Sequence, residues 1–269
     1  MSKDTVLITG ATSGIGFELA KIFAKNGYPL VIVARDKAEL ERTAAHLKQL
    51  STINVTAIAK DLFEPGSAKD LYQEIKAQNV PIGILVNNAG QGQYGEFVDS
   101  DLQRQLDIIQ LNISSLVSLT HYFLQDFKAK RGGKILNVSS TASKSPGPWQ
   151  AVYHATKAFV QSFTEAIRSE LKDHNIVVTA LLPGATDTDF FNKAQMNASK
   201  VVQDKEKMSD PADVAQDGYD ALMNNDDMVV SGFKNKANVA MSGIIPDEQL
   251  ADKTNKSQEP VNKKKAVNS

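Results

Sequence analysis

Cysteine is absent from the 269 residues of this chain. Its absence excludes disulfide bonds, thiolate metal ligands and cysteine nucleophiles, and it suits a reducing compartment. The 4 histidines are scattered, with no carboxylate or cysteine partners at ligand spacing. We therefore expect no metal site.

No charge of one sign dominates, and no long hydrophobic run occurs. Lys and Arg number 30 and Asp and Glu number 31, so the chain lacks the basic surface that nucleic-acid binding requires. No segment approaches the roughly 20 apolar residues that span a bilayer. Residues 1–4 lead directly into strand-like sequence instead of a basic and then apolar signal. A cytoplasmic protein without a membrane span is expected.

Short apolar runs alternate with longer amphipathic stretches, as in strand–helix–strand units around a parallel sheet. The runs expected to form strands are residues 6–8, 30–33, 55–58, 84–86, 134–138, 176–182 and 228–230. Most are almost wholly apolar, as strands covered on both faces should be. The sequence predicts one α/β domain over residues 1–250 and a polar, lysine-rich, flexible tail over residues 251–269.

Two long helices are expected over residues 101–127 and 151–173, and shorter ones over 14–25 and 37–50. The apolar stripes of the long helices could cover the sheet, or they could support a subunit interface. Ser209-Asp210-Pro211 predicts the start of a further helix.

A glycine-rich segment joins the first expected strand to the first expected helix. Gly10, Gly14 and Gly16 allow a sharp turn and the close approach of a pyrophosphate to N–H groups at the helix start. Residues 90–95 carry the better-known G-x-G-x-x-G spelling, but the acidic stretch that follows is too short to be the helix this motif opens. We interpret the first segment as the phosphate-binding turn and the second as a loop beside a binding cleft.

Tyr153 and Lys157 lie four residues apart in an expected helix, so their side chains share one face. Lowering a tyrosine pKa from about 10 to about 7 requires roughly 4 kcal/mol of phenolate stabilisation, and a nearby ammonium acts in that direction. The spacing alone is common in helices. Ser140, at the end of the run over 134–138, adds a hydroxyl at the edge of the sheet where such folds build their sites.

Taken together, the motifs resemble the classical short-chain dehydrogenase/reductases over about residues 5–230. The motifs are Thr9-Gly10-x-x-x-Gly14-x-Gly16, Asn87-Asn88-Ala89-Gly90, Asn112, Ser140, Tyr153-x-x-x-Lys157 and Pro183-Gly184. The resemblance implies a doubly wound Rossmann fold, with a seven-stranded parallel sheet and helices on both faces. It also implies a nicotinamide cofactor, a small carbonyl or alcohol substrate, and a homodimer or homotetramer built on the two long helices.

The resemblance also assigns roles to single residues. Ser140, Tyr153, Lys157 and Asn112 would be catalytic. The cofactor would be bound by Gly10, Thr12, Ser13, Gly14, Ile15, Gly16, Arg35, Asp61, Leu62, Asn88, Ala89, Gly90, Tyr153, Lys157, Pro183, Gly184 and Thr188. In reduction, Tyr153 would donate a proton to the developing alkoxide and Ser140 would bind the same oxygen. Lys157 would hold the nicotinamide ribose and tune Tyr153, and Asn112 would hold a water that relays protons to Lys157.

The residues after the second expected strand bear on the choice between NADP and NAD. Arg35 could bind a 2′-phosphate with two charge-assisted hydrogen bonds, each of about 1.5–3 kcal/mol, and favour NADPH by a hundredfold or more. Asp36 would shift the preference toward NAD if it faced the ribose, or it could cap the next helix. We expect NADP(H), with NAD as the alternative.

A carbonyl reductase is the leading hypothesis. Its alternatives are an NAD-dependent alcohol dehydrogenase and a dinucleotide-binding regulator without turnover. The substrate pocket is expected from residues 91–98, 141–150 and 185–208. Five aromatic residues hint that this pocket is roomy and apolar: Tyr94, Phe97, Trp149, Phe190 and Phe191.

Overall fold

Seven strands form one sheet at the centre of the computed structural model, which describes residues 3–196, 198–203 and 208–261. The strands are β1 (Thr5–Thr9), β2 (Leu30–Ala34), β3 (Val55–Ala59), β4 (Ile82–Asn87), β5 (Gly133–Val138), β6 (Ile176–Leu182) and β7 (Met228–Val230). All six pairings in the order β3-β2-β1-β4-β5-β6-β7 are parallel. This confirms the predicted doubly wound Rossmann fold.

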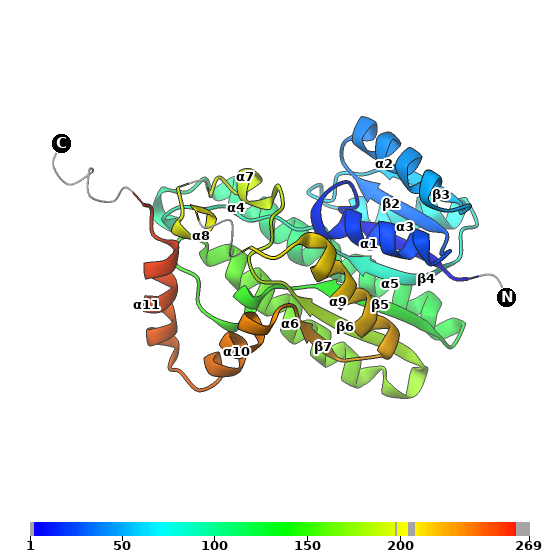
Figure 1. Ribbon diagram of the computed structural model, residues 1–269. Helices are drawn as coiled ribbons and strands as arrows, with labels where there is room; N and C mark the ends of the chain where they lie inside the picture. The colour runs from blue at the N-terminus through cyan, green and yellow to red at the C-terminus, as the bar shows by residue number, and fades with distance from the viewer. Residues whose placement is uncertain (1–2, 197, 204–207, 262–269) are drawn as a thin grey trace.

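Helices cover both faces of the sheet (Figure 1). One face carries α1 (Gly14–Lys25), α2 (Lys37–Leu50) and α9 (Pro211–Asn224); the other carries α3 (Ser67–Ala77), α5 (Leu116–Ala129) and α6 (Ala151–Glu170). Because successive side chains of a strand point to opposite faces, Val6 and Ile8 pack in the first layer and Leu7 packs in the second. The central strands β1 and β2 are mostly apolar because both of their faces are covered.

The long helix expected over residues 101–127 contains an irregular segment. It consists of α4 (Leu102–Ile109), a π-helical stretch (Gln110–Ser115) and then α5. Short π-helical segments inside α-helices occur frequently at functional sites. Asn112 lies within this one.

Several short elements lie beyond the carboxyl ends of the strands, at the left of Figure 1. They are α7 (Phe190–Lys193), α8 (Lys200–Gln203), α10 (Phe233–Ser242) and α11 (Asp247–Gln258). Three 3-10 turns complete the connections in the described part of the chain: Phe97–Asp99, Thr141–Lys144 and Lys172–His174.

The structure differs from the flexible tail predicted from residue 251. Residues 251–258 continue α11, so the predicted domain boundary at residue 250 falls inside this helix. Its sequence is polar because most of the helix faces outward, but Leu250 and Gln258 are buried. Asn255 also accepts a hydrogen bond from Trp149 Nε1 at 2.7 Å. Residues 262–269 of the predicted tail lie outside the described residues.

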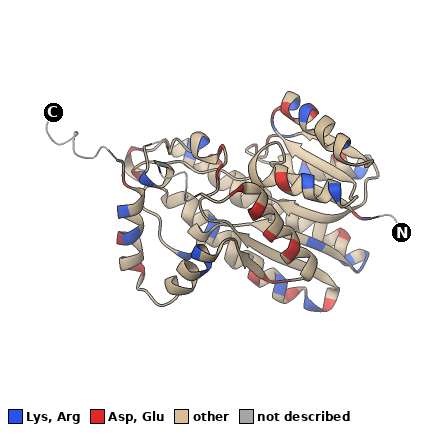
Figure 2. Cartoon of the chain, viewed as in Figure 1, with Lys and Arg blue, Asp and Glu red and all other residues tan. Residues whose placement is uncertain are grey.

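Charged side chains of both signs are interspersed over the outer helices in the view of Figure 2. This agrees with the near balance of acidic and basic residues in the sequence. Within the described part of the chain, every helix is too short or too polar to cross a membrane.

Candidate active site

The glycine-rich turn connects β1 to α1 and is tied to the end of β4. Gly10 and Gly14 have φ of 64° and 54°, in the left-handed region that favours glycine. Asn88 Nδ2 donates to Thr9 O at 2.9 Å and to Gly10 O at 3.0 Å. A Cβ on Gly16 would overlap both Asn88 Nδ2 and Gly10 O, so glycine is required there by packing.

This turn fits a dinucleotide phosphate. Ser13 precedes α1 with an extended backbone, and its side chain makes no capping hydrogen bond. The first amides of a helix have no acceptor within the helix, and they attract anions. The cleft that begins at this turn has a volume of about 880 Å³ and reaches Ser140, Tyr153 and Lys157.

The cleft brings together nearly all the residues predicted to bind the cofactor or to act in catalysis. It is lined by every one of them except Gly16 and Asn112. Both exceptions are buried behind its wall. The part of the chain that the structure describes contains no cluster of three or more potential metal ligands.

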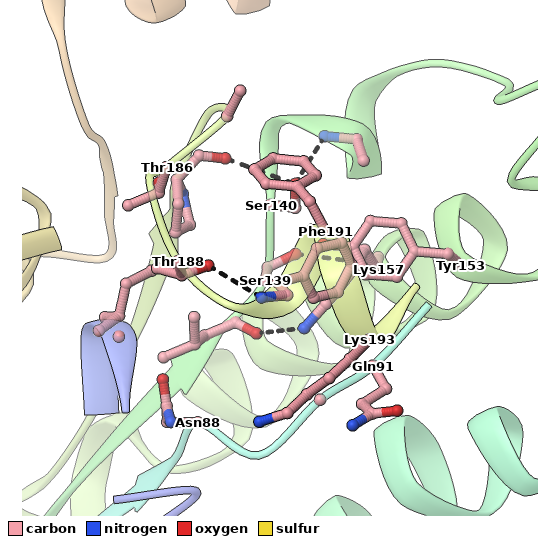
Figure 3. A pocket seen from close by; sticks show the side chains of 18 of the residues that line it. Asn88, Gln91, Ser139, Ser140, Tyr153, Lys157, Thr186, Thr188, Phe191 and Lys193 are labelled. Atoms are coloured by element: carbon pink, nitrogen blue, oxygen red, sulfur yellow. Dashed lines mark hydrogen bonds between the residues drawn. The ribbon is translucent and has the colours of Figure 1, made fainter. Parts of the chain in front are cut away.

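Ser140, Tyr153 and Lys157 meet at one end of the cleft, with Asn88 toward the other (Figure 3). A hydrogen bond joins Tyr153 to Ser140. Lys157 Nζ lies 5.8 Å from the centre of the Tyr153 ring and donates to Val138 O at 2.8 Å. The ammonium therefore faces the ring and the end of β5.

The two serines after β5 have different partners. Ser139 Oγ donates to Lys157 O at 2.9 Å and ties β5 to α6. Ser140 Oγ accepts from Ala142 N at 3.1 Å and lines the cleft beside Tyr153. Ser139 also lines the cleft, but the hydroxyl bonded to Tyr153 is that of Ser140, the serine that the sequence predicted for this role.

Burial works against the charged forms of both Tyr153 and Lys157. It raises the pKa of Tyr153 to about 12, although the hydrogen bond with Ser140 acts in the opposite direction. Burial also lowers the pKa of Lys157 to about 8. Lys157, whose Nζ donates to Val138 O, does not contribute to this shift of the Tyr153 pKa, so the lowering expected from the sequence is not found here. Tyr153 is held as a neutral phenol, the form that can donate a proton.

The lowered pKa of Lys157 has a consequence for stability. Below about pH 8 this lysine is charged in both the folded and the unfolded protein, and the cost of burying the charge is fully present. Between pH 8 and its ordinary pKa of 10.5 the unfolded chain binds more protons, so stability rises with pH and the cost is absent above 10.5.

Lys157→Met is therefore expected to raise the free energy of unfolding at pH 7, by on the order of 3 kcal/mol before the lost hydrogen bond to Val138 O is subtracted. The gain should shrink as the pH approaches 10.5. Urea unfolding of both proteins at several pH values measures this, with Lys37→Met on the exposed start of α2 as the control. A difference between wild type and Lys157→Met that does not change with pH would contradict the assignment.

Asn112 connects the cleft wall to α6. Its Nδ2 donates to Gln91 O and to Thr156 Oγ1, each at 2.9 Å, and its Oδ1 accepts from Gln91 N at 3.0 Å. A Cβ on Gly90 would lie 3.2 Å from Lys157 Nζ and 3.4 Å from Asn112 Oδ1, so these two groups flank Gly90. Asn112 thus positions the loop at Gln91; the water relay stays a prediction.

Arg35 and Asp36 follow β2, and their contacts bear on the two roles considered for Asp36, contact with the ribose or capping of α2. Asp36 accepts a hydrogen bond from Glu39 N at 2.8 Å, which confirms that it caps α2. Arg35 is half exposed, with its guanidinium 4.9 Å from the Phe63 ring and 4.0 Å from Asp61.

The sequence did not reveal that α10 and α11 form a wall of the cleft. Leu250, Lys253 and Gln258 are among their lining residues. Their low hydrophobicity is typical of surface helices, and no motif marks them. Of the five aromatic residues expected at the pocket, only Phe190 and Phe191 line the cleft, because Trp149 stacks on Tyr94 at 5.8 Å and packs toward α11.

The fold and the glycine-rich turn define a dinucleotide-binding α/β protein, and comparison with known proteins identifies its family. The family model described as short chain dehydrogenase matches residues 4–199. The chain belongs to the short-chain dehydrogenase/reductase family, as its motifs predicted.

Relatives are similar over much of the chain. The very-long-chain 3-oxoacyl-CoA reductase of Anas platyrhynchos is 35% identical over 183 residues, which are 66% of this chain but only 58% of that protein. The dehydrogenase/reductase SDR family member 7B of Mus musculus is 31% identical over 248 residues, 90% of this chain and 74% of that one. A solved short-chain dehydrogenase from Sphingobium yanoikuyae in complex with NADPH is 31% identical, with a TM-score of 0.80, over 93% of this chain and 99% of that one.

Proposed function

We propose that this protein is an NADP(H)-dependent carbonyl reductase acting on a small-molecule ketone or aldehyde. The observation that carries the proposal is the meeting of Ser140, Tyr153 and Lys157 at the end of a dinucleotide-sized cleft. A phenol placed in this way can give a proton to the alkoxide oxygen that forms in reduction.

The chain's own groups would act as follows. Ser140 and Tyr153 hold the carbonyl oxygen between two hydroxyls, and Tyr153 gives its proton to that oxygen as negative charge develops. Lys157 Nζ lies 5.8 Å from the centre of the Tyr153 ring, where it would hold the ribose of the nicotinamide. A bound nicotinamide supplies the hydride. The amides at the start of α1 would hold its pyrophosphate.

The NADP(H) preference is proposed from Arg35. Asp36 is already engaged at the cap of α2, whereas the Arg35 side chain is half exposed beside the cleft. The NADPH complex of the Sphingobium yanoikuyae relative supports the same choice.

The direct test follows NADPH absorbance with a panel of ketones and aldehydes. A carbonyl reductase is expected to consume NADPH with at least one of them. An NAD-dependent alcohol dehydrogenase would instead respond to NAD and alcohols. A regulator without turnover would bind NADPH and leave every substrate unchanged.

A homodimer or homotetramer is proposed from the outer surface of the long helices. Leu102 and Leu106 on α4 and Phe159 on α6 are exposed, and Phe159 stacks on Phe163 at 6.0 Å. α4 and α6 also contact each other, so these side chains belong to neighbouring surfaces.

Phe159→Glu is expected to shift the assembly toward monomers, because it places a charge in the proposed interface. Light scattering coupled to size-exclusion chromatography measures the mass. Phe233→Glu, at a phenylalanine on α10 that is even more exposed, is the control and should not change the mass. A monomeric wild-type protein would contradict the proposal.

A further inference from the structure

Gln150 occupies the position that caps α6, yet its side chain makes no capping hydrogen bond. Helix caps favour Ser, Thr, Asp and Asn, whose short side chains reach the first amides of the helix. The backbone of Gln150 is held without help from its side chain, since its N donates to Gly147 O and its O accepts from His154 N, both at 3.0 Å. The local structure therefore leaves the Gln150 side chain free for another role.

The side-chain nitrogen of Gln150, Nε2, is buried and without a partner in the described part of the chain. The residue is only 5% exposed, and its Nε2 makes no hydrogen bond. A buried donor left unpaired costs about 1–3 kcal/mol. Gln150 also lines the cleft that holds Ser140 and Tyr153. Such a donor is satisfied when a ligand brings an acceptor to it.

Gly92 shows how close this donor lies to Tyr153. A Cβ on Gly92 would lie 3.3 Å from Gln150 Nε2, 3.3 Å from Tyr153 Cδ2 and 3.0 Å from Phe190 Cζ. The Phe190 ring lies 5.1 Å from the Tyr153 ring. The amide donor, the phenol and a phenylalanine on the short helix α7 thus converge on one side of the cleft.

Gln258 is the other cleft-lining residue in the described chain that has a buried, unpartnered side-chain atom, its amide oxygen. Its amide nitrogen, however, already has a hydrogen-bond partner. His154 Nδ1 lies 2.9 Å from the carbonyl oxygen of Ser145, so this nitrogen carries the proton. His154 Nε2 is then the acceptor for Gln258 Nε2 at 3.1 Å. This bond fixes the Gln258 amide, whereas the Gln150 amide has no such partner.

We propose that Gln150 recognises a second oxygen of the substrate, and that the substrate is a 3-oxo ester or thioester. The inference rests on the proposed reductase function. The 3-oxo group lies between Ser140 and Tyr153, and the ester carbonyl oxygen accepts a hydrogen bond from Gln150 Nε2. Gln150 Nε2 and Tyr153 Cδ2 each lie 3.3 Å from one point, the position of a Cβ on Gly92, and this closeness suits oxygens on alternate carbons of one chain.

The reaction balances as an ordinary reduction. C3 gains a hydride from NADPH, the C3=O π bond opens, and its oxygen takes the Tyr153 proton. The products are the 3-hydroxy ester and NADP⁺, and one proton from solvent restores Tyr153. Gln150 moves no proton; it is a specificity-determining residue.

The test compares two substrates with chains of equal length, ethyl 3-oxobutanoate and 2-heptanone, in wild type and Gln150→Met. The variant keeps the length of the side chain and removes its donor. We expect kcat/KM for the keto ester to fall by about 10- to 100-fold, the value of one buried hydrogen bond, while the value for the plain ketone changes less than about threefold. Comparing each substrate with itself removes their difference in intrinsic reactivity.

Gln161→Met is the matched control. Gln161 is a buried glutamine of the same helix, also with an unpartnered amide oxygen, but it does not line the cleft. It should affect both substrates alike. Gln150→Glu is the second variant, because a carboxylate of the same size accepts hydrogen bonds but does not donate them. Its kcat/KM should also fall for the keto ester and change little for the plain ketone.

Melting temperature and NADPH binding establish that each variant is folded. Equal losses with both substrates, or no loss with the keto ester, overturn the inference and leave the reductase standing. Absence of turnover with both substrates and with the whole carbonyl panel overturns the proposed function, and this inference with it.

Discussion

Tyr153→Phe is expected to lower kcat for carbonyl reduction by about 10²–10⁴-fold, the range that a positioned proton donor contributes. The substitution removes the hydroxyl that bonds Ser140 and leaves the ring that packs against Phe190. It should therefore remove proton donation without opening the cleft. NADPH turnover at saturating ketone measures the loss, and NADPH fluorescence should show cofactor binding within a few-fold of wild type.

Tyr219→Phe controls for the loss of a tyrosine hydroxyl elsewhere. Tyr219 packs against Phe23 at 5.1 Å on the face of the sheet that carries α1 and α9, away from the cleft lining. This variant should retain wild-type turnover. If Tyr153→Phe kept more than about a tenth of the activity, a different group would be the proton donor. If neither wild type nor variant turned over while both bound NADPH, the protein would be a regulator.

The fold was predictable because both faces of the sheet are buried. Residues 30–33 are apolar at every position and residues 176–182 at every position but Thr179, and the strands observed there end within one residue of the predicted bounds. The start of α9 was also readable, because Asp210 caps it through Ala212 N and Pro211 occupies its first position. Each of these signals is local in sequence, so it requires no knowledge of distant contacts.

The α11 wall of the cleft was not predictable for the opposite reason. Its contacts bring together residues more than a hundred positions apart, as in Trp149 with Asn255 and His154 with Gln258. A polar helix of this kind has little apolar surface of its own to mark it. The π-helical stretch around Asn112 is likewise invisible in hydrophobic periodicity, because its flanking helices continue the same apolar pattern.

The sequence identified Tyr153 and Lys157 as site residues, but it did not predict the direction in which their pKa values shift. Spacing of four residues correctly puts both side chains on one face of α6 and in one cleft. Spacing does not say that Lys157 Nζ is bonded to Val138 O, or that burial raises the pKa of Tyr153 to about 12. The site residues could be chosen from sequence, but their protonation required the packed structure.

Arg35→Ala is expected to raise the KM for NADPH by about 100-fold and to change that for NADH only a few-fold. Two charge-assisted hydrogen bonds to a 2′-phosphate contribute about 1.5–3 kcal/mol each. The present partners of Arg35 compete weakly, since an exposed ion pair such as that with Asp61 contributes about 0–1 kcal/mol. The contact with the Phe63 ring adds about 0.5–1 kcal/mol. The net gain on binding the phosphate is then about 1–5.5 kcal/mol, a range centred near the roughly 2.8 kcal/mol that a hundredfold requires.

Initial rates with each cofactor measure this effect, and Arg42→Ala, at an exposed arginine of α2 outside the cleft lining, is the control. Asp36→Ala separates the two interpretations of the strand end. Because Asp36 accepts from Glu39 N, its loss should cost about 0.5–2 kcal/mol of stability and leave the ratio of NADPH to NADH activity unchanged. A fall in NADH activity on Asp36→Ala, with no effect of Arg35→Ala on NADPH, would show instead that the carboxylate contacts the ribose.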